Sequence, residues 1–317
     1  MIKKLLATVL MTMSAAAFAV PFGSQSVLVV EDDTGKILLE KNADTVMPIA
    51  SLTKLMTAMV VLDAKLDMDE QIEIDRSDVD TVKFSSSRVP VGASIARRDV
   101  LHLALMSSDN RAAAALARTY PGGKEGFKAA VRRKIHALGM TQTSIEEPTG
   151  LSPHNRSTAT DLVKMATAST RYPEIVRMTT ESKDIIDING RGVEYRNTNR
   201  LVGAKGWDIG LSKTGFTNEA GRCLIMNFTA AGKKATLVLL NAGASSARVL
   251  DALNIRRFIT GDEPVNRVAR AASGGPRIKA SAGSAKAKAR AKSKSSKAKA
   301  TKKRKTAKVT STRKRRD

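Results

Sequence analysis

The fold and the chemistry of this 317-residue chain are decided at residues 50–58, which read ASLTKLMTA. Ser51 precedes Lys54 by three residues at the start of the segment 51–65, in which Leu, Met and Ala recur at helical spacing. Residues three apart on a helix share a face, so the Lys54 amine can reach the Ser51 hydroxyl. Burial and a second cation lower the pKa of a lysine, which then can accept the serine proton. The segment predicts a buried helix that carries a nucleophile and its base.

An S-x-x-K spacing alone is a weak signal, because a serine before a helix is often only its N-cap. Two further motifs strengthen it. Ser108-Asp109-Asn110 lies between two predicted helices, and Lys213-Thr214-Gly215 follows residues 208–212, which resemble an edge strand. The simpler interpretations are an interhelical cap for the second motif and a strand end for the third. The three motifs in this order are typical of β-lactamases and penicillin-binding proteins.

The match extends beyond the motifs. Residues 108–113 read SDNRAA and residues 210–217 read GLSKTGFT. Together with 50–58 they make residues 26–258 similar to the D-alanyl-D-alanine peptidase family of low-molecular-mass penicillin-binding proteins, and most similar to its endopeptidase branch. The resemblance implies a serine acyl-transfer enzyme that acts on peptidoglycan stem peptides, is acylated by β-lactams and needs no metal or cofactor.

The resemblance also implies the roles of three catalytic residues. Ser51 attacks the D-Ala carbonyl and forms an acyl-enzyme that water later hydrolyses. Lys54 is the base that accepts the Ser51 proton. Ser108 lies between Lys54 and Lys213 in the family pattern, where its hydroxyl relays a proton to the leaving amine.

The substrate-binding residues follow from the other two motifs. Asn110 is expected to hold a substrate amide. Lys213 is expected to keep its positive charge beside Lys54 and, with Thr214 and Thr217, to attract a substrate carboxylate. Gly215 is expected to let the stem peptide approach the strand closely, as in β-strand addition.

The oxyanion hole is expected to consist of the backbone N–H groups of Ser51 and Phe216. Many carboxypeptidases of the family carry histidine where this chain has Phe216. This difference favours an endopeptidase that cleaves D-alanyl cross-links in cell wall remodelling. The alternatives are a carboxypeptidase that trims pentapeptide stems and, with less support, a serine β-lactamase.

The rest of the chain predicts an α+β fold with one antiparallel sheet built from both ends, flanked by helices and joined to a helical subdomain. The resemblance implies the same arrangement, a penicillin-binding protein/β-lactamase-like transpeptidase fold. The expected hairpins pair 26–30 with 36–40, 184–188 with 193–196, and 224–228 with 236–240, and the expected helices are 51–65, 99–107, 111–120, 124–138, 158–169 and 245–258.

The two ends of the chain predict export and an unusual tail. Residues 1–19 have two lysines, an apolar stretch and the ending Ala17-Phe18-Ala19, which is typical of a cleaved signal peptide. We therefore expect a periplasmic enzyme with its peptidase domain at 20–262. Residues 263–317 are expected to form a disordered basic tail.

The tail accounts for most of the formal net charge of +24, since residues 271–317 hold 18 Lys and Arg and one acid. Such charge is also typical of nucleic-acid-binding proteins. The tail, however, has no aromatic residue for base stacking, and export places it away from nucleic acid. We expect it to bind the anionic envelope surface instead.

The remaining reactive side chains indicate no other chemistry. His102, His136 and His154 lack metal-ligand spacing, and the single Cys223 permits no intrachain disulfide and is expected to be a buried apolar side chain. Glu146 and Glu147 lack the E-x-x-x-N spacing of a deacylating glutamate, which argues against a β-lactamase.

Overall fold

The computed structural model describes residues 22–262. The predicted signal peptide at 1–19 and the predicted tail at 263–317 lie outside the described residues. Within 22–262, no helix has both the length and the apolar character needed to cross a membrane.

A five-stranded antiparallel sheet forms one half of the fold, in the order β2-β1-β11-β10-β9. The strands are β1 (Ser26–Glu31), β2 (Ile37–Lys41), β9 (Asp208–Thr217), β10 (Gly221–Ala230) and β11 (Lys233–Ala242). The N-terminal hairpin pairs with β11, where Val29 lies opposite Leu237. The sheet is thus built from both ends of the chain, and β9 is an edge strand, as predicted.

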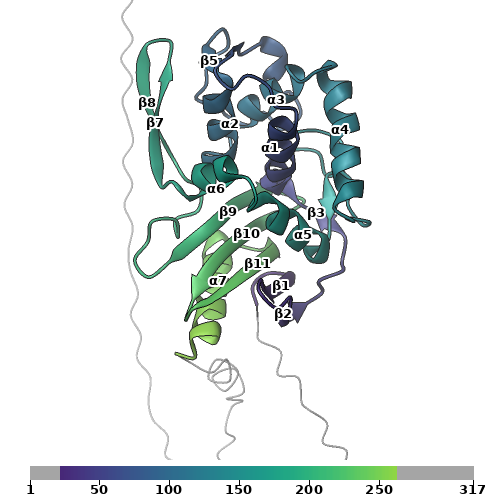
Figure 1. The fold of residues 1–317 in the computed structure, drawn as a ribbon, viewed down its shortest axis with the longest axis vertical. Helices are drawn as coiled ribbons and strands as arrows, with labels where there is room; N and C mark the ends of the chain where they lie inside the picture. Colours follow the sequence, from purple (N-terminus) through teal and green to yellow (C-terminus); the bar gives the residue numbers. More distant parts are fainter. Residues whose placement is uncertain (1–21, 263–317) are drawn as a thin grey trace, which may run out of the picture. The chain divides into compact units, whose positions relative to one another are not determined.

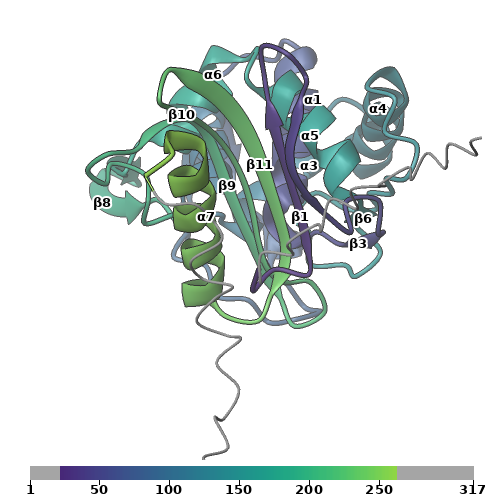
Figure 2. The same ribbon diagram turned by 90° about the horizontal axis from the view of Figure 1, so that it is seen from below.

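Both faces of the sheet are covered, because alternate residues of each strand point to opposite sides. Helix α7 (Ser245–Thr260) lies along one face (Figure 2), where Ile255 belongs to the same apolar cluster as Val27 and Val29. On the other face, Leu28 and Val238 belong to the larger core shared with the remaining helices.

The helical subdomain surrounds α1 (Thr53–Asp63), which lies among the other helices in Figure 1. Every residue from Thr53 to Val61 is buried. The other helices are α2 (Arg97–Met106), α3 (Asn110–Arg118), α4 (Gly123–Ala137), α5 (Ala159–Ser169) and α6 (Pro173–Thr180). A helix that is buried on all sides lies at the centre of its packing partners, so α1 is the centre of this half.

Short elements complete the fold. The strands β3 (Met47–Pro48) and β6 (Arg156–Ser157) pair with each other, as do β4 (Gln71–Glu73) and β5 (Ser94–Ala96). The hairpin of β7 (Lys183–Ile188) and β8 (Arg191–Arg196) lies beside the helical subdomain in Figure 1, and its Ile186, Ile188 and Tyr195 belong to the same buried core. Two 3₁₀ turns, η1 (Ala50–Leu52) and η2 (Arg76–Asp78), precede α1 and follow β4.

The predicted fold class is confirmed, with two local differences. Helix α6 was not predicted, because Pro173 reads as a break, whereas in the structure it occupies the first turn of the helix, where its missing N–H costs nothing. Strand β9 continues to Thr217, so Lys213-Thr214-Gly215 lies inside the strand and not at its end.

Candidate active site

Ser51 lies in the 3₁₀ turn η1, directly before α1. Its side chain does not cap α1, whose N-cap residue is Leu52 and makes no side-chain capping bond. The simpler interpretation of Ser51 as an N-cap is therefore wrong. Ala50 has a φ of +46°, a conformation that non-glycine residues rarely adopt and that often occurs at functional sites.

Two glycines fix the position of the Ser51 backbone. A Cβ on Gly150 would overlap the Ala50 carbonyl and lie 2.8 Å from the Ser51 nitrogen. A Cβ on Gly215 would lie 3.1 Å from the same nitrogen. Because Gly215 has no side chain, β9 can approach the turn that carries Ser51. The sequence led us to expect that this glycine lets a substrate approach the strand, whereas in the structure it lets another part of the chain approach.

The Lys54 amine makes three hydrogen bonds. It donates to the Ser51 hydroxyl at 3.0 Å, to the Asn110 side-chain oxygen at 2.6 Å and to the Thr149 carbonyl at 2.7 Å. Three acceptors around one buried ammonium satisfy all three of its protons. Loss of the proton that faces Ser51 leaves a lone pair directed at that hydroxyl, while the other two bonds keep the amine in place.

Burial is the main cause of the lowered pKa of Lys54, which falls from 10.5 to about 8. The negative charges of Glu147 and Asp109 act in the opposite direction. The sequence predicted the direction correctly, but it attributed part of the effect to the charge of Lys213. Burial lowers the pKa of Lys213 too, and the charges of Lys54 and Arg248 lower it further. Lys213 is thus pushed toward its neutral form, contrary to the expectation that it keeps its positive charge beside Lys54.

The second motif forms the link between α2 and α3. Asp109 caps α3 by accepting a bond from the Ala112 N–H at 3.0 Å, so the structural interpretation of this motif as an interhelical cap is correct for Asp109. Asn110, besides accepting from Lys54, donates to the Ser85 hydroxyl at 2.8 Å. Ser108 has a φ of +61°, and its hydroxyl makes no hydrogen bond within residues 22–262.

The third motif places a buried lysine on the edge strand. Lys213 is 1% exposed, and its amine donates only to the Thr214 carbonyl, at 3.2 Å, among the residues described. The Thr214 hydroxyl donates to Thr198, whereas the Thr217 hydroxyl accepts from the Ala220 N–H and helps to lower the pKa of the Glu219 carboxyl through a hydrogen bond. Both hydroxyls are therefore engaged within the protein, and each must exchange partners to bind a substrate carboxylate.

Phe216 is the exposed residue of this strand, at 47%. The Arg222 guanidinium lies 3.5 Å from the centre of its ring, on the paired strand β10. This stacking fixes an aromatic surface and a positive charge together beside the third motif.

The loop 146–155 is a part of the site that the sequence did not predict. The Glu147 carboxylate accepts bonds from the Thr149 N–H at 2.7 Å, from the Thr149 hydroxyl at 2.6 Å and from the Gly150 N–H at 2.7 Å. Buried Asn155 donates to the Glu147 carboxylate at 2.9 Å and to Thr53 in α1 at 3.1 Å. These bonds hold the Thr149 carbonyl at Lys54.

A second loop, 80–87, joins the second and third motifs. Its Ser87 hydroxyl donates to Asp109 at 2.7 Å. Lys83 forms a salt bridge of 2.5 Å with Glu219, in the turn after β9, which lowers the pKa of Glu219 to about 2. The only sequence signal for either loop was the Pro148–Pro153 spacing, which marks a loop without indicating its partners.

The cysteine and histidine side chains considered in the sequence analysis lie outside the hydrogen bonds that surround Lys54. Cys223 is fully buried, as predicted, and burial raises the pKa of its thiol to about 11. His102 is buried with its Nε2 2.8 Å from Glu181 and its Nδ1 3.4 Å from Asp184. Among the described residues these three form the one group with metal-ligand geometry, and burial lowers the pKa of the histidine.

Comparisons with known proteins show which family the chain resembles. The family model described as D-alanyl-D-alanine carboxypeptidase matches residues 12–244. A D-alanyl-D-alanine endopeptidase of Pseudomonas aeruginosa is 49% identical over 238 residues, which cover 74% of this chain and 77% of that protein. A D-alanyl-D-alanine endopeptidase of Escherichia coli is 45% identical with the same coverage.

A solved structure gives the same result for the fold. The ampicillin-bound form of penicillin-binding protein D2 from Listeria monocytogenes superimposes with a TM-score of 0.65 at 30% identity, covering 77% of this chain and 100% of that one. The family match at residues 12–244 spans all five strands of the main sheet and helices α1 to α6.

Proposed function

The chain belongs to the D-alanyl-D-alanine carboxypeptidase family of serine peptidases, and we propose that it is an endopeptidase that cleaves D-alanyl cross-links between peptidoglycan stem peptides. The observation that carries the acyl-transfer chemistry is the 3.0 Å contact between the Lys54 amine and the Ser51 hydroxyl. No metal or cofactor enters the scheme.

Acylation begins when neutral Lys54 accepts the Ser51 proton. The Ser51 oxygen attacks the D-Ala carbonyl, and the backbone N–H groups of Ser51 and Phe216 stabilise the oxyanion. The fixed position of the Ser51 backbone between Gly150 and Gly215 supports this role, because preorganised donors need no rearrangement during the reaction.

Ser108 completes the proton transfer in this scheme. Its hydroxyl receives the proton that Lys54 accepted and passes it to the leaving amine as the D-alanyl amide bond breaks. The absence of other hydrogen bonds to this hydroxyl within residues 22–262 supports the role, because a committed hydroxyl cannot exchange partners freely. Water then hydrolyses the acyl-enzyme and restores Ser51.

Substrate binding uses the edge of β9. We expect the Lys213 amine, with Thr214 and Thr217 beside it, to attract a substrate carboxylate, whose negative charge favours the protonated lysine, and Gly215 lies in the edge strand that an extended peptide can join. Asn110 contacts a substrate amide after an exchange of its present partners, because both of its polar atoms are already bonded.

The β-lactamase alternative requires a glutamate that activates water for rapid deacylation. Glu147 lies near Lys54, yet its carboxylate accepts bonds from Thr149, Gly150 and Asn155 inside its own loop. A carboxylate whose oxygens are engaged by its own loop is not available to position and activate a water. The geometry therefore favours a peptidase with a long-lived β-lactam adduct.

The choice between endopeptidase and carboxypeptidase rests on similarity to the two endopeptidases, at 49% and 45% identity, although the family model carries the name of the carboxypeptidase. Phe216, stacked on Arg222, offers an aromatic surface to the second stem of a cross-linked substrate. A free pentapeptide has no second stem to use it.

A comparison of two purified substrates tests this choice. We expect a higher kcat/KM for cleavage of a cross-linked muropeptide dimer than for removal of the terminal D-Ala from a monomeric pentapeptide. A kcat/KM clearly higher on the pentapeptide would make the carboxypeptidase alternative correct.

We also propose that residues 1–19 direct export to the periplasm and that the basic residues of 263–317 hold the enzyme at the anionic envelope surface. The support is the sequence alone, namely the signal-peptide pattern and the 18 basic residues of 271–317.

A further inference from the structure

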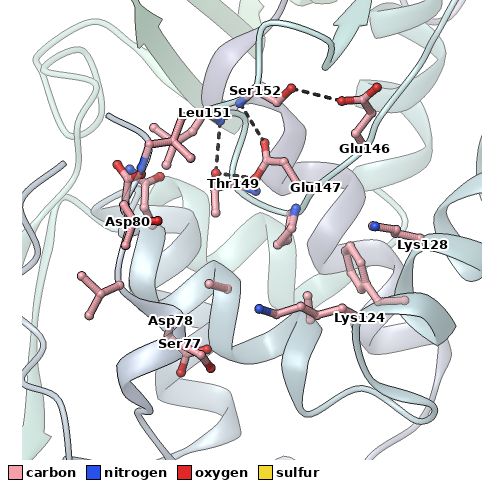
Figure 3. A pocket seen from close by; sticks show the side chains of 18 of the residues that line it. Ser77, Asp78, Asp80, Lys124, Lys128, Glu146, Glu147, Thr149, Leu151 and Ser152 are labelled. Carbon is pink, nitrogen blue, oxygen red and sulfur yellow. Dashed lines mark hydrogen bonds between the residues drawn. The ribbon is translucent and has the colours of Figure 1, made fainter. Parts of the chain in front are cut away.

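A group of titratable side chains outside the active site joins three elements of the fold. The cavity of about 550 Å³ in Figure 3 belongs to the active site, because its wall includes Asn110, whose side chain bonds to Lys54. The other group consists of His102 in α2, Glu181 at the end of α6 and Asp184 in β7, none of which lines that cavity. One ligand atom of each of the three residues lies within 4.8 Å of the other two.

His102 is the buried member of this group, with its side chain 3% exposed. Its Nε2 lies 2.8 Å from Glu181 Oε2, and its Nδ1 lies 3.4 Å from Asp184 Oδ2. Yet neither Nε2 nor Glu181 Oε2 has a hydrogen-bond partner among residues 22–262, since the close contact between them lacks the directions of a hydrogen bond. Buried polar atoms without a partner are rare, so this pair points to a ligand that the two atoms share.

One proton on the histidine does not satisfy both carboxylates. A neutral imidazole has a single N–H, so its second nitrogen faces an oxygen lone pair with a lone pair of its own. A second proton would remove this conflict, but burial lowers the pKa of His102 and outweighs the opposite effects of Glu181 and Asp184. The neutral imidazole is therefore favoured, and this is the form that binds metal ions.

A metal ion accounts for the two unpartnered atoms, because it accepts a lone pair from each. Two ligands of one ion, each bonded at about 2.1 Å, lie about 3.0 to 3.4 Å apart, so the 2.8 Å contact needs only a small adjustment. The other oxygens are engaged, Glu181 Oε1 by Arg177 at 3.0 Å and Asp184 Oδ1 by the Ile185 N–H at 2.8 Å. Each carboxylate therefore has one oxygen left for an ion.

The surroundings of the group supply the charge and the access that a cation needs. Asp99 adds a third negative charge that acts on His102, and Arg177 adds one positive charge. The side chains of Glu181 and Asp184 are 32% and 44% exposed, so an ion can enter from solvent and water can complete its coordination. The excess of negative charge favours a divalent cation.

We propose that His102, Glu181 and Asp184 form a binding site for a divalent transition-metal ion of the Zn²⁺ type, held by Nε2 and one oxygen of each carboxylate. Zn²⁺ accepts imidazole nitrogen together with carboxylate oxygen, whereas Mg²⁺ prefers oxygen alone. The ion ties α2 to the β7–β8 hairpin. Because α2 ends at Met106, two residues before Ser108, the ion supports the second motif without touching the reacting groups.

Calorimetric titration of the untagged, chelator-treated protein with ZnCl₂ tests the proposal. We expect the wild-type protein to bind one Zn²⁺ per chain and to show no binding of Mg²⁺ at the same concentration. Glu181→Gln and Asp184→Asn are expected to bind Zn²⁺ at least tenfold more weakly, because each loses a charged ligand while keeping its size. The matched control is Asp187→Asn in the same strand, which removes an exposed carboxylate outside the group and can still accept the bond from the Gly190 N–H.

Two further measurements locate the ion. Saturating Zn²⁺ is expected to raise the midpoint of thermal unfolding by about 5 °C and to slow amide hydrogen exchange in residues 181–197. Both effects are expected in the wild-type protein and in Asp187→Asn, and neither in Glu181→Gln or Asp184→Asn. Acylation by a β-lactam without metal checks that each variant is folded.

A wild-type protein that does not bind Zn²⁺ would overturn the proposal, and the histidine would then be only a partner of its two carboxylates. Binding that both substitutions leave unchanged, or that leaves exchange in residues 181–197 unchanged, would overturn it too, because the ion would lie elsewhere. None of these results affects the proposed peptidase function, since the site contains no reacting group.

Discussion

The chemistry of the site depends at the residue scale on the protonation of Lys54. Its three hydrogen bonds suit an ammonium, whereas its proposed role requires the neutral amine. Burial resolves this conflict by lowering the pKa to about 8, so that a useful fraction is neutral near physiological pH.

The first prediction concerns the pH dependence of acylation. The neutral fraction of Lys54 rises with pH up to its pKa, so the second-order rate of acylation by a β-lactam is expected to rise about tenfold per pH unit below about 8 and to level off above it. Stopped-flow measurement between pH 5.5 and 9.5 checks this. A rate that is flat across this range would show that Lys54 is not the base.

The second prediction concerns the acidic neighbours of Lys54. Glu147 and Asp109 raise its pKa, so removal of either charge must lower it. In Glu147→Gln the midpoint of the acylation profile is expected to move to lower pH. Asp109→Asn is expected to move it in the same direction while keeping the cap of α3, since asparagine caps helices as well as aspartate does.

The matched control for this prediction is Glu219→Gln, which removes a carboxylate paired with Lys83 that is not among the causes of the Lys54 shift. Its profile is expected to keep the wild-type midpoint. Unchanged midpoints in both test variants would assign these two carboxylates a purely structural role.

At the element scale, the site depends on three chain segments that meet at the turn before α1. The 3₁₀ turn η1 carries Ser51, β9 approaches it at Gly215, and the loop 146–155 approaches it at Gly150. The close packing at both glycines explains why the turn can hold Ala50 at a φ of +46°.

The third prediction concerns that packing. Gly150→Ala is expected to displace the Ser51 backbone and to slow acylation about a hundredfold, the order expected for a misplaced nucleophile. Gly92→Ala is the matched control, because Gly92 has a similar φ of +82° against +86° but nothing near its missing Cβ. It is expected to lose some stability and to retain its acylation rate; equal rates in both variants would contradict the packing argument.

The sequence was a good guide to the elements that follow periodic patterns. The hairpin of β1 and β2, the buried α1 and the edge position of β9 all follow from local spacing. The loops 80–87 and 146–155 have no such period, because their structure is set by side-chain contacts such as Asn155 with Thr53, which are far apart in sequence. The motifs identified Ser51, Lys54 and Asn110 because a motif consists of the residues that take part in the reaction. They did not identify Glu147 because the hydrogen bonds that position those residues come from elsewhere in the chain.

At the scale of the whole molecule, the site lies where the sheet and the helical subdomain meet. The helical half supplies Ser51, Lys54 and Asn110, and the sheet supplies Lys213. The salt bridge between Lys83 and Glu219 spans these two halves. We therefore expect activity to require both halves to be folded and joined.

The fourth prediction concerns the basic C-terminal segment. Truncation after Asp262 is expected to leave the β-lactam acylation rate unchanged, since every residue of the site lies before it. The truncated protein is expected to be released from isolated envelopes, and moderate salt is expected to release the full-length protein, because salt screens contacts with an anionic surface. A truncated protein that stays bound, or a full-length protein that resists salt, would require a specific partner for this segment.

The central claim, an acyl-enzyme on Ser51, is tested most directly by intact-protein mass spectrometry after incubation with a β-lactam. The wild-type protein is expected to gain the mass of one β-lactam, with the adduct on the peptide that contains Ser51 and a lifetime of minutes. Ser51→Ala is expected to gain no mass while keeping its fold. Stoichiometric labelling of Ser51→Ala would contradict the account, because the nucleophile would then lie elsewhere.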